Sequence, residues 1–101
     1  MKLVIVTSVE EYHDDILQIF KKSNIQNFSE SEIDGYKNTP AILSSNNWFA
    51  ANKSVTNSIM LFSFTEKEKI DVLFEHLEAY NQKLENNSPI KAIVLPIEKS
   101  L

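Results

Sequence analysis

The chain contains one local pattern twice, and this repetition limits the folds open to it. An apolar run occupies residues 3–6 and another occupies residues 59–64. Each run is followed by a hydroxyl residue with a glutamate three positions later, which is the spacing of a helix capping box. The two pairs are Ser8 with Glu11 and Thr65 with Glu68. We therefore predict two units of strand, capped helix and strand in a single domain covering residues 1–101.

Both predicted helices have apolar residues on one side at the helical period. The first spans about residues 9–22 and the second about residues 66–84. The apolar positions of the first helix are Val9, Tyr12, Ile16, Ile19 and Phe20. Those of the second are Ile70, Leu73, Phe74, Leu77, Tyr80 and Leu84. Each helix should bury one face against a sheet.

The remaining segments complete an α+β fold. We predict strands at residues 25–34, 58–64 and 91–95 in addition to the first run. Strand–helix–strand units with right-handed crossovers then give a ferredoxin-like βαββαβ sandwich, an antiparallel four-stranded sheet with two helices on one face. The other face carries Met60, Phe62 and Phe64 and has no element to cover it. Such a patch implies a partner, and self-association is the simplest case.

The long connection between the two units is the first candidate for a functional element. It spans about residues 36–57, which is long for a connection in a compact domain. Gly35, the only glycine, stands just before it, where we expect the strand to end and the backbone to need a positive φ. Trp48 and Phe49 form an aromatic pair in this segment. Two roles remain open for the pair: subunit packing, or recognition of a ligand or partner.

Composition excludes several classes of function. All ten basic residues are lysine, and the net charge is −4, so nucleic-acid binding is not expected. There is no cysteine, and therefore no disulfide framework or thiolate metal site. No apolar run approaches the ~20 residues of a membrane span, and the first residues do not resemble a signal peptide. We expect a cytoplasmic protein without direct membrane insertion.

No pattern in the sequence favours catalysis. An acylphosphatase-like enzyme would need a phosphate cradle and an arginine after the first strand, where this chain has the acidic segment 7–11. Phe62 and Phe64 lie where an RNA-recognition domain stacks bases, but the basic and glycine residues that open that motif are missing. His13 and His76 are the two histidines, and we interpret both as residues of solvated helix faces. Helical spacing could bring Glu10 to His13, but two ligands do not make a closed metal site.

The order of several motifs resembles the PII-like superfamily. These motifs are the opening segment 1–5, the segment 32–37, the long excursion after it and the closing segment 91–98. Segment 93–98 is also similar to the end of CutA-type divalent-cation tolerance proteins. The resemblance implies a non-catalytic signalling protein, a homotrimer that senses a small-molecule effector in clefts between subunits. It also implies a long loop that docks on a transporter or enzyme target.

Carried onto this chain, the resemblance assigns candidate ligand residues. Gly35, Tyr36 and Lys37 would form the base of the loop, and Lys91 matches a lysine that meets nucleotide phosphate. The family's glycine-rich turn before that lysine is replaced here by the segment 86–90, and the arginines after the last strand are absent. Lysine lacks the bidentate fork of arginine for phosphate. These departures argue against classical ATP binding and leave the ligand unassigned. The alternative function is CutA-like binding of a divalent metal by Glu, Asp and His side chains.

Overall fold

The computed structural model describes residues 1–38, 53–85 and 88–101. Its strands are β1 (Lys2–Val9), β2 (Ser29–Asn38), β3 (Lys53–Thr65) and β4 (Lys91–Pro96). Its helices are the short 3-10 helix η1 (Glu10–Tyr12), α1 (His13–Lys22) and α3 (Lys67–Lys83). In these ranges no helix is long and apolar enough to cross a membrane.

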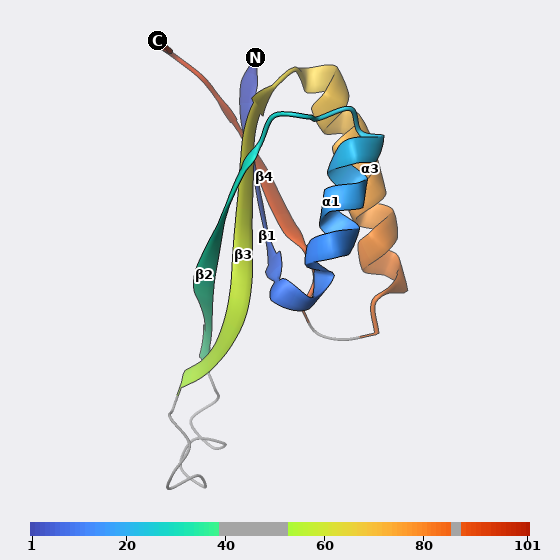
Figure 1. Ribbon diagram of the computed structural model, residues 1–101, viewed down its shortest axis with the longest axis vertical. Helices are drawn as coiled ribbons and strands as arrows, with labels where there is room; N and C mark the ends of the chain where they lie inside the picture. The colour runs from blue at the N-terminus through green and yellow to red at the C-terminus, as the bar shows by residue number, and fades with distance from the viewer. Residues whose placement is uncertain (39–52, 86–87) are drawn as a thin grey trace, which may run out of the picture.

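The four strands form one antiparallel sheet in the order β2-β3-β1-β4. α1 and α3 lie side by side on the same face of this sheet (Figure 1). The predicted ferredoxin-like α+β fold is therefore confirmed. We call the face that packs on the helices the inner face and the opposite one the outer face.

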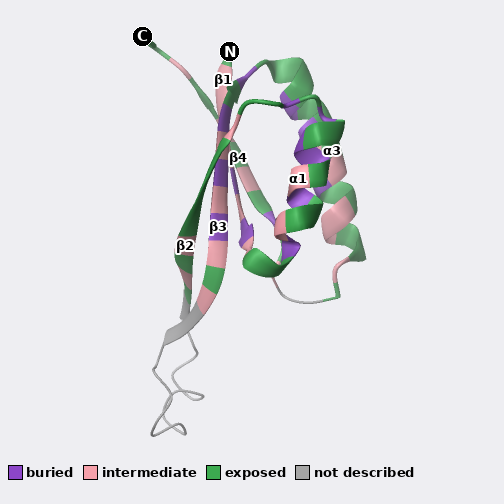
Figure 2. Ribbon diagram, viewed as in Figure 1, coloured by how far each residue is buried: buried purple, intermediate pink, exposed green. Residues whose placement is uncertain are grey.

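The core lies between the inner face and the two helices (Figure 2). Side chains alternate along β1 and β3, so that Val4 and Val6 of β1 and Ile59 and Leu61 of β3 are buried. The helices contribute Ile16, Ile19, Phe20, Ile70, Leu73 and Leu77, which belong to the predicted apolar stripes. β1 and β3 therefore send every second residue toward the helices and the others to the outer face.

Tyr80 links the two helices at their surface. Its hydroxyl donates a hydrogen bond to Asp15 Oδ2 at 2.6 Å, and its ring meets Tyr12 edge-on at a centroid distance of 5.6 Å. Burial, with the Asp15 carboxylate as a further cause, raises the pKa of Tyr80 to about 12. The phenol therefore stays protonated and keeps donating across the physiological pH range.

The predicted capping boxes do not form. No side chain caps η1, α1 or α3; the N-cap residues are Val9, Tyr12 and Glu66. The reason is that both strands run further than expected: β1 includes Ser8 and β3 includes Thr65, and both hydroxyl residues are buried in the sheet. Ser8 Oγ donates instead to the carbonyl oxygen of Val9 at 2.9 Å.

The loop bounds predicted at residues 36–57 are also wrong. β2 begins at Ser29 rather than at residue 25, and it continues through Gly35 to Asn38. β3 begins at Lys53, and the two strands pair from Asp34 opposite Asn57 to Asn38 opposite Lys53. β1 has no residue beside these positions, because its last partner in β3 is Ser58. Residues 34–38 and 53–57 thus form a two-stranded arm beyond the sheet (Figure 1), and the connection itself is shortened to residues 39–52.

The burial of Leu61 predicts how a truncation at this position affects stability. Leu61 is fully buried, so Leu61→Ala should lower the free energy of unfolding by about 2–5 kcal/mol through lost burial and a residual cavity. Val72 is 39% exposed on α3, and Val72→Ala should change it by about 0.5 kcal/mol or less. Urea unfolding of both variants measures the difference. Equal losses would contradict the placement of the core.

Candidate functional site

Strand register brings several polar residues to one end of the outer face. Gly35, Ser58, Thr7 and Lys91 are in β2, β3, β1 and β4, the order in which these strands neighbour one another. Thr7 pairs directly with Lys91, and Ser58 pairs with both Ile33 and Val9. These strands and residues 88–89, just before β4, border an open hollow of about 460 Å³, which we call the strand-end hollow. Its lining is Thr7, Ser8, Val9, Ile33, Gly35, Ser58, Ser88, Pro89 and Lys91.

Two of the four candidate ligand residues meet in this hollow. Gly35 and Lys91 both line it, although they are far apart in the sequence. Tyr36 does not line it; its side chain is 63% exposed, and strand alternation directs it to the inner side. Lys37 is in β2 opposite Ser54, but its side chain lies outside the described residues, as do Trp48 and Phe49. The ligand role of all four candidates stays a prediction.

Gly35 permits a close approach of the Ser58 side chain and is not part of a turn. The expected positive φ is wrong, because Gly35 has none and lies inside β2 instead of at its end. A Cβ atom built on Gly35 would lie 2.8 Å from Ser58 Oγ, on the neighbouring strand. That hydroxyl donates to the carbonyl oxygen of Thr56 at 3.2 Å. A larger residue would force the hydroxyl to rotate and would narrow the hollow.

A side-chain clamp from α3 fixes the entry to β4 and therefore the position of Lys91. Asn81 Nδ2 donates to the carbonyl oxygen of Ile90 at 2.9 Å, and the Ile90 amide donates to Asn81 Oδ1 at 2.8 Å. Ile90 is also buried in the core. No local signal in the sequence marks this clamp, since Asn81 is one of several polar residues near the end of α3.

The lining chemistry suits a small anion with an apolar part. Lys91 is exposed and forms no ion pair with any described residue, so its ammonium group is available to a ligand. Hydroxyls of Thr7 and Ser58 lie on the same wall, while Val9, Ile33 and Pro89 supply apolar surface. Pro89 has no backbone N–H, which weakens this turn as a cradle of amides for phosphate.

Solved structures share this architecture. A PII-like signalling protein of Thermus thermophilus superposes with a TM-score of 0.63 at 14% sequence identity, covering 95% of this chain and 85% of its own. GlnK of B. subtilis, solved in complex with ATP, gives a TM-score of 0.67 at 13% identity, covering 96% and 84%. This chain has the PII-like fold. No family model and no curated protein matches the sequence.

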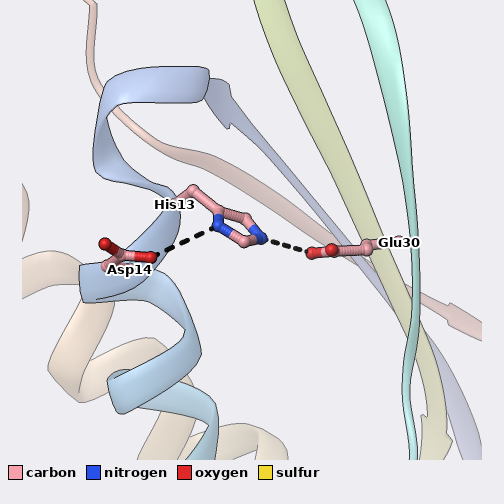
Figure 3. Close-up of polar contacts among 3 residues, drawn as sticks. All are labelled: His13, Asp14 and Glu30. Carbon is pink, nitrogen blue, oxygen red and sulfur yellow. Dashed lines mark hydrogen bonds and ion pairs between the residues drawn. The ribbon is translucent and has the colours of Figure 1, made fainter.

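A second polar group lies on the helix side of the PII-like sheet, around His13 (Figure 3). His13 Nε2 lies 2.7 Å from Glu30 Oε2 of β2, and Nδ1 lies 3.5 Å from Asp14 Oδ1. The hydrogen bond to Glu30 raises the pKa of His13 above its ordinary value of 6.5, and the charges of Glu30 and Asp14 act in the same direction. The imidazolium form therefore ties the start of α1 to β2.

This contact adds to the interpretation of His13 as a residue of a solvated helix face, because it is exposed but reaches a second element. Its partner is Glu30, 17 residues away on a strand, rather than Glu10 on the same helical segment. Spacing along one helix could not reveal a partner on another element.

The structure adds no support for a metal site. No group of three or more His, Asp or Glu side chains within residues 1–38, 53–85 and 88–101 is placed to hold a metal ion. Divalent metal binding therefore stays a prediction from the sequence.

The pKa shift of His13 predicts a pH-dependent contribution to stability. Because the folded-state pKa is raised, the contribution is complete below the unfolded value of 6.5 and is lost as the pH rises through the folded value. His13→Ala should lower the free energy of unfolding at pH 6 by up to about 1 kcal/mol, the range of exposed ion pairs, and by less at pH 9.

Urea unfolding at both pH values, with Glu30→Gln and the double variant, isolates the His13–Glu30 pair. A coupling energy that is equal at pH 6 and pH 9 would contradict the assigned ion pair.

Proposed function

We propose that this protein is a non-catalytic regulator of the PII-like type. In this proposal three copies join through their outer sheet faces, a small ligand binds in the strand-end hollow, and the long connection recognises a partner. The observation that carries the proposal is the apolar outer face of the sheet.

Two cross-strand rows make up this face. Leu3 of β1 lies between Phe64 of β3 and Leu95 of β4. Ile5 lies in the same way between Phe62 and Ile93. We call these six residues the outer rows.

The outer rows remain open to solvent in a single chain. Phe64 is 55% exposed, Ile93 54% and Leu95 42%, and the rings of Phe62 and Phe64 meet edge-on at 6.3 Å. No charged residue interrupts the rows. A contiguous apolar patch of this kind marks an interaction surface.

A sister chain is the simplest occupant of that surface. The same patch is present on every copy, and identical subunits usually close into symmetric assemblies. The PII-like resemblance implies three of them. Packing of the outer rows would add burial that a chain of 101 residues obtains only in part on its own.

The ligand would bind beside that interface. The strand-end hollow opens on the outer face, so a neighbouring subunit in the assembly would close it. The structurally similar GlnK was solved in complex with ATP. This chain, however, has no arginine and has Pro89 two residues before Lys91. We therefore assign the hollow to a small anion bound through Lys91 rather than to ATP in the classical manner.

The arm supports a recognition role for the connection it carries. The arm extends beyond the sheet end that bears the hollow, and residues 39–52, including Trp48 and Phe49, connect its two strands along the chain. A ligand that contacts Gly35 would touch the base of the arm and so bias its direction. A transporter or enzyme is the expected class of target for such a regulator.

The assembly is tested by placing charge in the outer rows. Phe64→Asp with Ile93→Asp should convert the assembly to monomers, because the buried carboxylates would lose their hydration without gaining partners. Val72→Asp with Ala79→Asp, both at exposed positions of α3, adds the same charge as the matched control and should leave the assembly intact. Sedimentation velocity at micromolar concentration distinguishes the two results. Retention of the native assembly by Phe64→Asp with Ile93→Asp would contradict the proposed interface.

The ligand site is tested by thermal-shift screening with nucleotides, bicarbonate and divalent metals. A ligand bound only by the native state stabilises it by about 2.7 kcal/mol at a concentration 100 times its Kd. Lys91→Gln should abolish the shift caused by an anion, whereas Lys99→Gln should preserve it. Equal shifts of the melting temperature in both variants would exclude the strand-end hollow as the binding site. A shift of the melting temperature with metals alone would favour the CutA-like alternative.

A further inference from the structure

β4 is an edge strand whose middle lacks the usual protection. It pairs with β1 on one side only and ends the order β2-β3-β1-β4. Natural edge strands are commonly blocked by charged residues, proline or bulges. In β4 these occur only at the ends, as Lys91 and Pro96, while residues 92–95 are apolar. The backbone between the two ends is open to another strand.

A groove with an apolar floor runs between this edge and α3. A hollow of about 260 Å³ is lined by Val94 of β4 and by Ile70, Asp71, Phe74, Glu75 and Glu78 of α3. Ile70 is buried, and Phe74 and Val94 are half-buried against the core. The groove therefore offers an apolar pocket next to unpaired strand backbone.

The rim of the groove is acidic. Asp71, Glu75 and Glu78 are exposed and span about 10 Å along α3 at ~1.5 Å per residue. Lys67 Nζ lies 2.8 Å from Asp71 Oδ2, but Glu75 and Glu78 have no ion-pair partner among the described residues. Two unneutralised carboxylates beside an apolar pocket select for a positively charged occupant.

We propose that this groove binds an extended, basic segment of a partner protein. The segment adds a strand to the free edge of β4, in the manner of β-augmentation. An apolar side chain of the segment enters the pocket between Phe74 and Val94. Lysine or arginine side chains of the same segment face Glu75 and Glu78.

Charge disfavours the other edge of a second copy as the occupant. The opposite edge strand of the sheet, β2, carries Glu30, Glu32 and Asp34, which are of the same sign as the rim. The pocket differs from the proposed trimer interface, because Val94 belongs to the inner face and the outer rows do not line the pocket. Ile93 and Leu95 of the same strand belong to the outer rows, so the inference rests on an assembly that leaves the backbone edge of β4 free.

Fluorescence anisotropy with a labelled peptide that alternates lysine with leucine and valine tests the proposal. The intact protein should bind this peptide saturably. A peptide with glutamate in place of lysine should not bind. A lysine peptide of equal charge with proline at alternate positions should bind at least tenfold more weakly, because proline removes the backbone donors.

Matched charge variants locate the site. Glu75→Lys with Glu78→Lys should weaken binding of the lysine peptide at least tenfold. Glu11→Lys with Glu85→Lys makes the same change in net charge on exposed residues that do not line the groove, and should leave the affinity unchanged. Circular dichroism confirms that both proteins are folded.

Three results would overturn the proposal. One is equal weakening by the two double variants, which would mean unspecific attraction to an acidic protein. Another is equal affinity for the proline peptide, which would exclude pairing with β4. The third is a change of oligomeric mass in Glu75→Lys with Glu78→Lys alone, which would assign the groove to a second copy of this chain.

Discussion

The structure depends on one imbalance: a sheet with two apolar faces and helices on only one of them. The alternation along β1 and β3 sends Val4, Val6, Ile59 and Leu61 into the core. The same alternation sends the outer rows to the opposite side. Helix packing satisfies the first set and leaves the second in water, where an apolar patch is unfavourable. Association of the outer faces resolves this imbalance in our account.

The position of the strand-end hollow follows from the same sheet. Thr7, Val9 and Ser58 continue the register of the outer rows toward the end of the sheet. At this end Lys91 is the first residue of β4, and Gly35 lies at the base of the arm. A ligand in the hollow would thus touch the proposed interface, the start of β4 and the base of the arm. In the proposed function, this contact is how a small molecule would change what residues 39–52 present to a partner.

The sequence predicted the order of elements, the buried faces of both helices and the uncovered sheet face, because each depends on local periodicity. Residues such as Ile70, Leu73 and Leu77 recur at the helical spacing whatever surrounds them. Strand ends were less predictable: polar residues such as Lys53 and Asn57 continue β3 only because β2 pairs with them. The capping boxes do not form for the same reason, because Ser8 and Thr65 pair within the sheet and do not cap the helices.

Contacts between distant elements could not be predicted from spacing. Glu30 is the partner of His13, and Asn81 holds Ile90 at the entry to β4. Gly35 illustrates the same limit: its lack of a side chain suggested a turn, while its role depends on Ser58 of the neighbouring strand. The PII-like resemblance assigned both Gly35 and Lys91 to a ligand site, and the sheet register supplies the physical cause of their meeting.

The mass of the unmodified protein in solution tests the central claim most directly. Native mass spectrometry at micromolar concentration should give an assembly of three 11.6 kDa chains, since the outer rows are covered only by sister subunits in this account. A stable species of one 11.6 kDa chain under the same conditions would mean that the apolar face tolerates water, and it would contradict the account.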